Sequence, residues 1–149
     1  MQLNWIFKKF DNLTASELYA IMQLRNEVFV VEQNCVYQDA DDKDQHCWHL
    51  CGWDTKKLVA YTRIIPPGIS YTEASIGRVV TSPAYRAAGA GRELMKESIS
   101  LTYSQFNCTQ IKIGAQLYLT KFYQSLGFVQ SSPEYLEDGI AHIEMVLDK

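Results

Sequence analysis

The sequence predicts an α/β to α+β fold in which helices flank a mixed central β-sheet. Three observations lead to this prediction. Strand-like and helix-like segments follow one another roughly in the order β-α-β-β-β-α-β-α-β-β. No repeat, low-complexity tract or Pro/Ser-rich linker interrupts them, and a hydrophobic content of 47% suffices for a core. With 149 residues, the chain is expected to form a single domain over residues 1–149.

The N-terminal part is predicted to form a strand and then a capped helix. Apolar and polar residues alternate over residues 3–8, as in a strand. Thr14-Ala-Ser-Glu17 matches a capping box, in which the Thr14 hydroxyl accepts a hydrogen bond from the Glu17 N–H. On the apolar face of the helix that follows lies Arg25, so a carboxylate partner for its guanidinium is expected nearby.

The rest of the chain is predicted to alternate between strands and two helices. Residues 46–53 and 57–66 indicate a β-hairpin, and 73–82 a fourth strand. A helix is expected from residue 88 to about 106, a strand at 109–115, a second helix at 117–128 that ends at Gly127, and a last strand at 141–147.

Composition excludes several classes of protein. A net charge of −3 argues against a general nucleic-acid-binding protein, which usually has a basic face. No apolar run approaches the roughly 18–20 residues that span a membrane, and the N-terminal MQLNWIFKKF lacks the apolar core of a signal peptide. We therefore expect a cytoplasmic protein without nucleic-acid or membrane partners. Its four cysteines are expected to be free thiols: Cys35, Cys47, Cys51 and Cys108.

Two clusters suggest a metal ion, but their spacing argues against one. The acidic residues between Asp39 and Asp44 lack the glycine that a calcium loop needs at its sixth position. In HCWHLC, Cys47 and Cys51 would lie about 13 Å apart on a strand, too far to share a zinc ion. No metal is expected. The acidic stretch is either a solvated connection, or Asp39 or Asp41 helps to orient a cationic amine.

A glycine-rich turn separates the fourth predicted strand, residues 73–82, from the helix predicted at residues 88–106. A helix N-terminus carries unpaired N–H groups and the positive end of the helix dipole. Gly89 and Gly91 remove Cβ atoms there and permit a positive φ, while Arg86 and Arg92 add positive charge. This combination is typical of a turn that binds phosphate or pyrophosphate, although a simple tight turn would have the same pattern.

Two familiar nucleotide-binding loops do not match this turn. A Walker loop would end in Gly-Lys-Ser/Thr, whereas Gly91 is followed by Arg92 and Glu93. The dinucleotide fingerprint would place a third glycine where Leu94 stands. A nucleotide-binding domain is therefore disfavoured.

Instead, two motifs resemble the GCN5-related N-acetyltransferase (GNAT) superfamily. VVTSPAYRAAGAGRELM is similar to its pyrophosphate loop, Arg/Gln-x-x-Gly-x-Gly/Ala, and IKIGAQLYLTKFYQSLGF to its later strand and helix, which end in Phe-Tyr-x-x-x-Gly-Phe. LRNEVFVVEQNCVYQDADDKD, HL, IGR and DGIAHIEM resemble the ElaA-like subgroup, with Ala141 in place of an expected proline. The resemblance covers almost the whole chain.

The resemblance implies the acyl-CoA N-acyltransferase fold, with acetyl-CoA or another acyl-CoA as donor and no metal. The pantetheine arm would pair with the strand edge at residues 79–81. The Val80 N–H is expected to stabilise the negative charge that develops on the thioester oxygen. The implied cofactor-binding residues are Val79, Val80, Thr81, Arg86, Ala87, Ala88, Gly89, Ala90, Gly91 and Arg92.

The same resemblance assigns a general acid but no general base. Tyr123 occupies the position from which many relatives protonate the leaving thiolate, although helical spacing alone would favour a core aromatic residue. Candidate bases are Glu32, Glu73, His49 and His142, and none is singled out. Residues expected to contact the acceptor are Glu32, Asp41, Glu73 and His142.

The predicted function is N-acetyl transfer from acetyl-CoA to a primary amine. The alternative is a sensor or regulatory module that binds acyl-CoA without turnover. The sequence leaves the acceptor open between a small-molecule amine and a peptide amine. It also leaves open a homodimer formed through the edge of the last strand.

Overall fold

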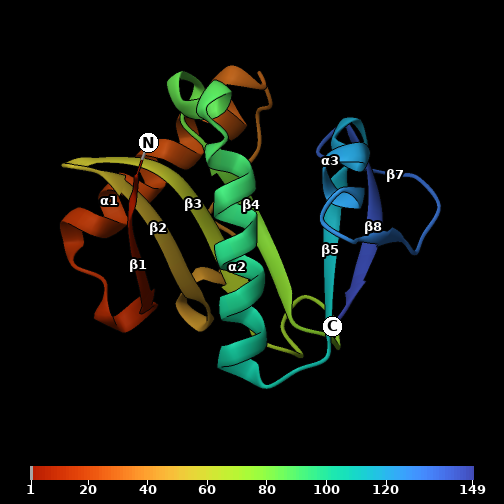
Figure 1. The fold of residues 1–149 in the computed structure, drawn as a ribbon. Coiled ribbons are helices and arrows are strands. Elements are labelled where there is room, and N and C mark those ends of the chain that lie inside the picture. Colours follow the sequence, from red (N-terminus) through yellow and green to blue (C-terminus); the bar gives the residue numbers. More distant parts are fainter. Residues whose placement is uncertain (1) are drawn as a thin grey trace.

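The computed structural model describes residues 2–149, which form two β-sheets that diverge from a common line (Figure 1). The first sheet has the strand order β1 (Asn4–Lys9), β2 (Trp48–Asp54), β3 (Lys57–Ile65) and β4 (Ser75–Thr81), all antiparallel. In the second, β8 (Ile140–Asp148) lies between β5 (Gln110–Gln116) and two short strands, β6 (Val129–Gln130) and β7 (Tyr135–Glu137).

The two sheets meet at the start of β4 and β5. There Ala74 forms a parallel bridge with Ile111, and the Lys112 N–H donates to the Ala74 carbonyl oxygen at 2.9 Å. This parallel contact makes the whole arrangement mixed, as the sequence predicts. Beyond this junction β4 and β5 separate.

Two helices cover opposite faces of the first sheet, because successive strand residues point to opposite sides. On β2, Leu50 packs with Leu94 of α2 (Ala90–Phe106), whereas Cys51 packs with Ile21 of α1 (Ala15–Arg25). Another core cluster, which includes Met95 of α2, fills the space between the sheets and packs against α3 (Thr120–Gln124).

Helix boundaries differ from the predicted ones at three places. After α1, residues Asn26–Glu32 continue as a π-helical turn. Before α2, residues Pro83–Ala88 form a 3₁₀ turn, so the α-helix begins at Ala90. The predicted helix at 117–128 contains only five α-helical residues, because a 3₁₀ turn precedes α3 and Gly127 follows it with a φ of +101°. Among residues 2–149, no helix is long and apolar enough to cross a membrane.

The predicted capping box is confirmed at the start of α1. The Glu17 N–H donates to the Thr14 hydroxyl at 3.1 Å, and the Thr14 N–H donates to the Glu17 carboxylate at 2.8 Å. We expect Thr14→Ala to lower the free energy of unfolding by about 0.5–2 kcal/mol in urea titrations, because it removes one of these bonds. The exposed neighbour Ser16 is the matched control: Ser16→Ala should cause no loss, and equal losses in the two variants would contradict a capping role.

Candidate active site

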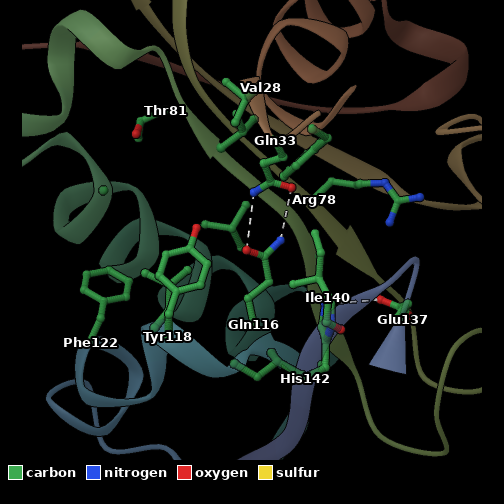
Figure 2. Close-up of a pocket in the computed structure, with 18 of the residues that line it drawn as sticks. Val28, Gln33, Arg78, Thr81, Gln116, Tyr118, Phe122, Glu137, Ile140 and His142 are labelled. Atoms are coloured by element: carbon green, nitrogen blue, oxygen red, sulfur yellow. Dashed lines mark hydrogen bonds and ion pairs between the residues drawn. The ribbon is translucent and has the colours of Figure 1, made fainter. Parts of the chain in front are cut away.

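A cavity with a volume of about 670 Å³ opens where β4 and β5 diverge. Its walls come from the π-helical turn after α1, strands β4 and β5, the turn that leads into α2, the region of α3, and the β7–β8 turn with the start of β8 (Figure 2). It therefore combines residues from both sheets.

A bulge in β4 accompanies this opening. Tyr61 on β3 pairs with Val80 and Arg63 pairs with Gly77, so Arg78 and Val79 both lie opposite the single residue Thr62. Arg78 has a φ of +50°, which is unusual for a residue other than glycine. Bulges of this kind bend a strand, and here the bulged segment lines the cavity.

The register of β4 determines which of its main-chain groups face the cavity. The Ser82 N–H donates to the Val59 carbonyl oxygen at 2.7 Å. In an antiparallel pair, main-chain groups alternate between the two sides of the strand, so those of Val80 are directed at Tyr61. Those of Val79 and Thr81 face the opposite way, toward the cavity. The Val80 N–H, expected to stabilise the charge on the thioester oxygen, is therefore directed away from the cavity, and the Val80 side chain lies in the core.

The N-terminus of α2 is uncapped and points at the same cavity. Within residues 2–149, no side chain caps this helix; its N-cap, Gly89, has a φ of +79°. A Cβ at Gly89 would meet none of the described atoms within 4 Å, so the turn is open on that side. Gly91 and Arg86 both line the cavity. The predicted residues between them, Ala87, Ala88 and Ala90, belong to the same continuous turn, with Ala90 fully buried.

The two arginines of the turn already have partners. Arg86 binds Glu32 through two hydrogen bonds, of 2.5 and 2.8 Å, and this lowers the pKa of Glu32. Arg92 donates to the Ser125 hydroxyl at 2.6 Å. Because the Arg86–Glu32 pair is exposed, an incoming anion can compete for this guanidinium at little cost.

Tyr123 lies in the wall opposite β4, where α3 packs on the core. Its ring packs edge-on against Phe122 and Phe128, and only 4% of the residue is exposed. Tyr123 nevertheless lines the cavity, as does its exposed neighbour Tyr118. Burial, reinforced by Tyr118, raises the pKa of Tyr123, so the phenol keeps its proton at neutral pH.

The four candidate bases are not brought together. Glu32 and His142 line the cavity, whereas Glu73 lies in the β3–β4 connection, where it lines a separate hollow. His49 is fully buried in the first sheet: Nδ1 is 2.6 Å from the Tyr61 hydroxyl and Nε2 is 2.9 Å from the Asp44 carbonyl oxygen. Burial lowers the pKa of His49, which keeps this ring neutral.

The acidic stretch after α1 is part of a buried ion-pair network, not a solvated connection. As expected, Arg25 has carboxylate partners: its Nε and Nη1 each contact a carboxylate at 2.7 Å, those of Asp39 and Asp44. Arg63 binds Asp41 at 2.7 Å, and Arg78 reaches both Asp39 and Asp41.

The predicted amine contact of Asp41 must therefore compete with two arginines. Burial alone would raise the pKa of Asp41, but its hydrogen bonds and ion pair with Arg63 lower it. Asp39 and Asp41 are not among the residues that line the cavity. The network instead holds the acidic loop against β3 and β4, since Arg63 lies on β3 and Arg78 on β4.

The cysteines and histidines of HCWHLC are divided between two elements: His46 ends a 3₁₀ turn and Cys47 follows it, whereas His49 and Cys51 lie on β2. Cys47 and Cys51 are both buried, and burial raises the pKa of each thiol. All four cysteines are free thiols. Residues 2–149 contain no group of three or more His, Cys, Asp or Glu side chains placed to hold a metal ion.

Two residues of the cavity wall were missed by sequence reasoning. The amides of Gln33 and Gln116 exchange hydrogen bonds of 3.3 and 3.4 Å across it (Figure 2). These residues lie far apart in the sequence, and no local pattern marks them as neighbours. Glu137, which lies beside His142 in the cavity wall (Figure 2), belongs instead to the segment of residues 135–144 that sequence reasoning assigned to the amine pocket.

Comparison with known proteins agrees with this geometry. Residues 14–149 match the family model described as an acetyltransferase (GNAT) domain. The chain belongs to the GNAT acetyltransferase family. ElaA of Escherichia coli K12 is 41% identical over 145 residues, which cover 96% of this chain and 95% of ElaA. A UPF0039 protein of Synechocystis is 40% identical over 147 residues, 98% of this chain and 96% of that protein.

Solved structures confirm the GNAT fold and the ElaA-like resemblance. The crystal structure of an acyl-CoA N-acyltransferase from Pseudomonas aeruginosa superposes with a TM-score of 0.93 at 40% identity, covering 98% of this chain and 99% of that one. The crystal structure of Escherichia coli ElaA superposes with a TM-score of 0.92 at 39% identity, covering 99% of this chain and 100% of that one. Membership of this GNAT family supports an acyltransferase that uses acyl-CoA.

Proposed function

We propose that this protein is an N-acetyltransferase that moves an acetyl group from acetyl-CoA directly to the primary amine of a small molecule or peptide. The observation that carries the proposal is one cavity lined by three features: the uncapped N-terminus of α2, the free edge of β4, and Tyr123. The first two would hold the donor, and the third stands ready to give a proton.

The residues present fit a CoA diphosphate and a pantetheine arm. Open space at Gly89 lets an anion approach the N–H groups of the turn, and Arg86 adds a charge that only a weak surface pair restrains. Along β4, the main-chain groups of Val79 and Thr81 can pair with the amides of an extended arm, as an added strand would.

Acyl-CoA, when bound, supplies a thioester carbonyl that an amine can attack. The Val79 N–H, nearer the bulge than Thr81, is the donor we assign to the carbonyl oxygen; loss of such a donor typically costs about 3 kcal/mol. Tyr123 then protonates the departing sulfur. Burial in the same cavity raises the basicity of a thiolate as well as that of a phenolate, so this transfer is not opposed by the raised pKa of Tyr123.

The direct test follows free-thiol release from acetyl-CoA with a panel of amines and peptides. Release that depends on an acceptor supports the proposal. Tight CoA binding without release for any acceptor would favour a sensor or regulatory module. Failure to bind CoA would contradict both.

Arg86→Ala should weaken CoA binding. A charge-assisted hydrogen bond contributes about 1.5–3 kcal/mol, so calorimetry should show Kd rising by roughly 10- to 100-fold, and more at low salt than at high salt. S-acetylpantetheine, which lacks the diphosphate, is the control ligand. Its affinity should be the same for the wild type and for Arg86→Ala. An equal loss for the two ligands would place Arg86 away from the diphosphate.

A further inference from the structure

We propose that His142 is the general base that takes a proton from the acceptor ammonium, and that Glu137 positions its ring. This inference rests on the proposed function, because it requires an amine acceptor. The structure joins the two side chains at the wall of the cavity, where the β7–β8 turn brings Glu137 beside β8 (Figure 2).

The hydrogen bond at Nδ1 fixes the tautomer of His142. Nδ1 lies 2.7 Å from the Ile140 carbonyl oxygen, and a carbonyl oxygen can only accept. Nδ1 must therefore carry the hydrogen, which leaves Nε2 with a free lone pair when the ring is neutral. The ring also stacks on Tyr135, with centroids 5.7 Å apart, so its plane is held as well.

The second ring nitrogen, Nε2, faces a carboxylate without being hydrogen-bonded to it. It lies 3.5 Å from Glu137 Oε2, beyond the normal hydrogen-bond distance. When the ring is neutral, a lone pair of Nε2 faces a lone pair of the Glu137 carboxylate. A proton on Nε2 would turn the same contact into an ion pair, so Glu137 is placed to hold the ring in this orientation after the proton transfer.

The other candidate bases are committed elsewhere. Both oxygens of Glu32 accept from Arg86, and both ring nitrogens of His49 have partners at 2.6 and 2.9 Å. Glu73 lines another hollow. Of the four, His142 alone combines a place in the cavity wall with an uncommitted basic atom.

The remaining titratable groups near His142 do not compete for this role. Burial raises the pKa of both Tyr135 and Tyr71, whose hydroxyls lie together over Gly114 of β5. On the same sheet, Lys112 and Glu144 pair with each other at 3.2 Å. Asp138, beside Glu137, lines the cavity and adds negative charge that attracts an ammonium.

The protons balance in the following way. One proton of the acceptor ammonium passes to His142 Nε2 and from there to solvent. The nitrogen then forms the C–N bond as the C–S bond breaks. A second proton leaves the nitrogen as the amide forms, and it replaces the one that Tyr123 gives to the sulfur. The net release is one proton for each acetyl group transferred.

The test compares two amines in His142→Gln, whose amide is similar in size but not basic. With n-propylamine, protonated at pH 7, kcat/KM should fall on the order of 10²-fold, and raising the pH should restore part of the rate. With hydroxylamine, already uncharged at pH 7, the rate should hardly change. Glu137→Gln should also slow the reaction of n-propylamine and spare that of hydroxylamine. Its loss in kcat should be smaller, because the His142 ring remains.

His46→Gln is the matched control, since His46 is exposed and lies outside the cavity wall, and it should change neither rate. CoA affinity should be the same in all variants. Suppose that the wild type acetylates n-propylamine, but that His142→Gln loses activity toward both amines equally or toward neither. The proposal is then overturned, while the proposed function stands. If the wild type acetylates no amine, the proposed function falls, and the base role with it.

A measurement without any substrate decides the tautomer. In wild-type protein with ¹⁵N-labelled histidine, NMR at a pH where the ring is neutral should show hydrogen on Nδ1 and none on Nε2 for His142. The signal is assigned by its loss in His142→Gln. Hydrogen on Nε2 would overturn the proposal.

Discussion

Tyr123→Phe is expected to lower kcat and kcat/KM together, on the order of 10²-fold, while leaving CoA affinity nearly unchanged. The variant keeps the ring that packs on Phe122 and Phe128 and removes only the hydroxyl. General acid catalysis typically contributes about 10²- to 10⁴-fold, and an interaction made only in the transition state affects both constants equally. Steady-state assays of thiol release measure this effect.

Tyr103→Phe provides the control for loss of a phenol outside the cavity. Its hydroxyl donates to the Leu147 carbonyl oxygen at 3.3 Å, it lies in the C-terminal part of α2, and it does not line the cavity. Its rate should equal that of the wild type. A Tyr123→Phe protein as fast as the wild type would remove Tyr123 from the mechanism and leave it a packing residue.

Arg25→Met is expected to cause the largest loss of stability, about 3–5 kcal/mol in the free energy of unfolding. The guanidinium is fully buried and binds Asp39 and Asp44 at 2.7 Å each. Methionine fills similar space but leaves two buried carboxylates with fewer partners. Urea denaturation followed by circular dichroism measures the loss.

Lys8→Met is the surface counterpart of this change. Lys8 binds Glu17 at 3.0 Å with a third of its side chain exposed, so its removal should cost less than about 1 kcal/mol. Similar losses in the two variants would contradict a structural role for the buried network. Because Arg78 belongs to that network and to the cavity wall, Arg25→Met should also weaken turnover at temperatures where the protein remains folded.

Local sequence signals predicted most of the fold. The capping box at Thr14 and Glu17 and the hairpin joining β2 and β3 depend on neighbouring residues, and the structure shows both. Arg25 on the apolar face of α1 predicted nearby carboxylate partners, and the structure shows them. The 3₁₀ turn before α3 escaped prediction because its residues also suit an α-helix, and tertiary packing decides between the two.

The candidate site was only partly predictable, for a related reason. Gly89, Gly91 and Arg86 form a contiguous turn, and a turn has a local pattern. The bulge at Arg78 has none, since its positive φ falls on a residue type that rarely adopts one. Neither the bulge nor the register of β4 can be read from the sequence. Sequence reasoning therefore chose the Val80 N–H, whereas in the structure the N–H of the adjacent Val79 faces the cavity.

The measurement that tests the central claim most directly is a crystal structure of the protein with acetyl-CoA. It should place the diphosphate within hydrogen-bond distance of N–H groups between residues 86 and 92. It should also show the pantetheine amides paired with Val79 and Thr81, and the thioester between β4 and Tyr123. A diphosphate bound elsewhere, or a β4 edge that makes no contact with the ligand, would contradict it.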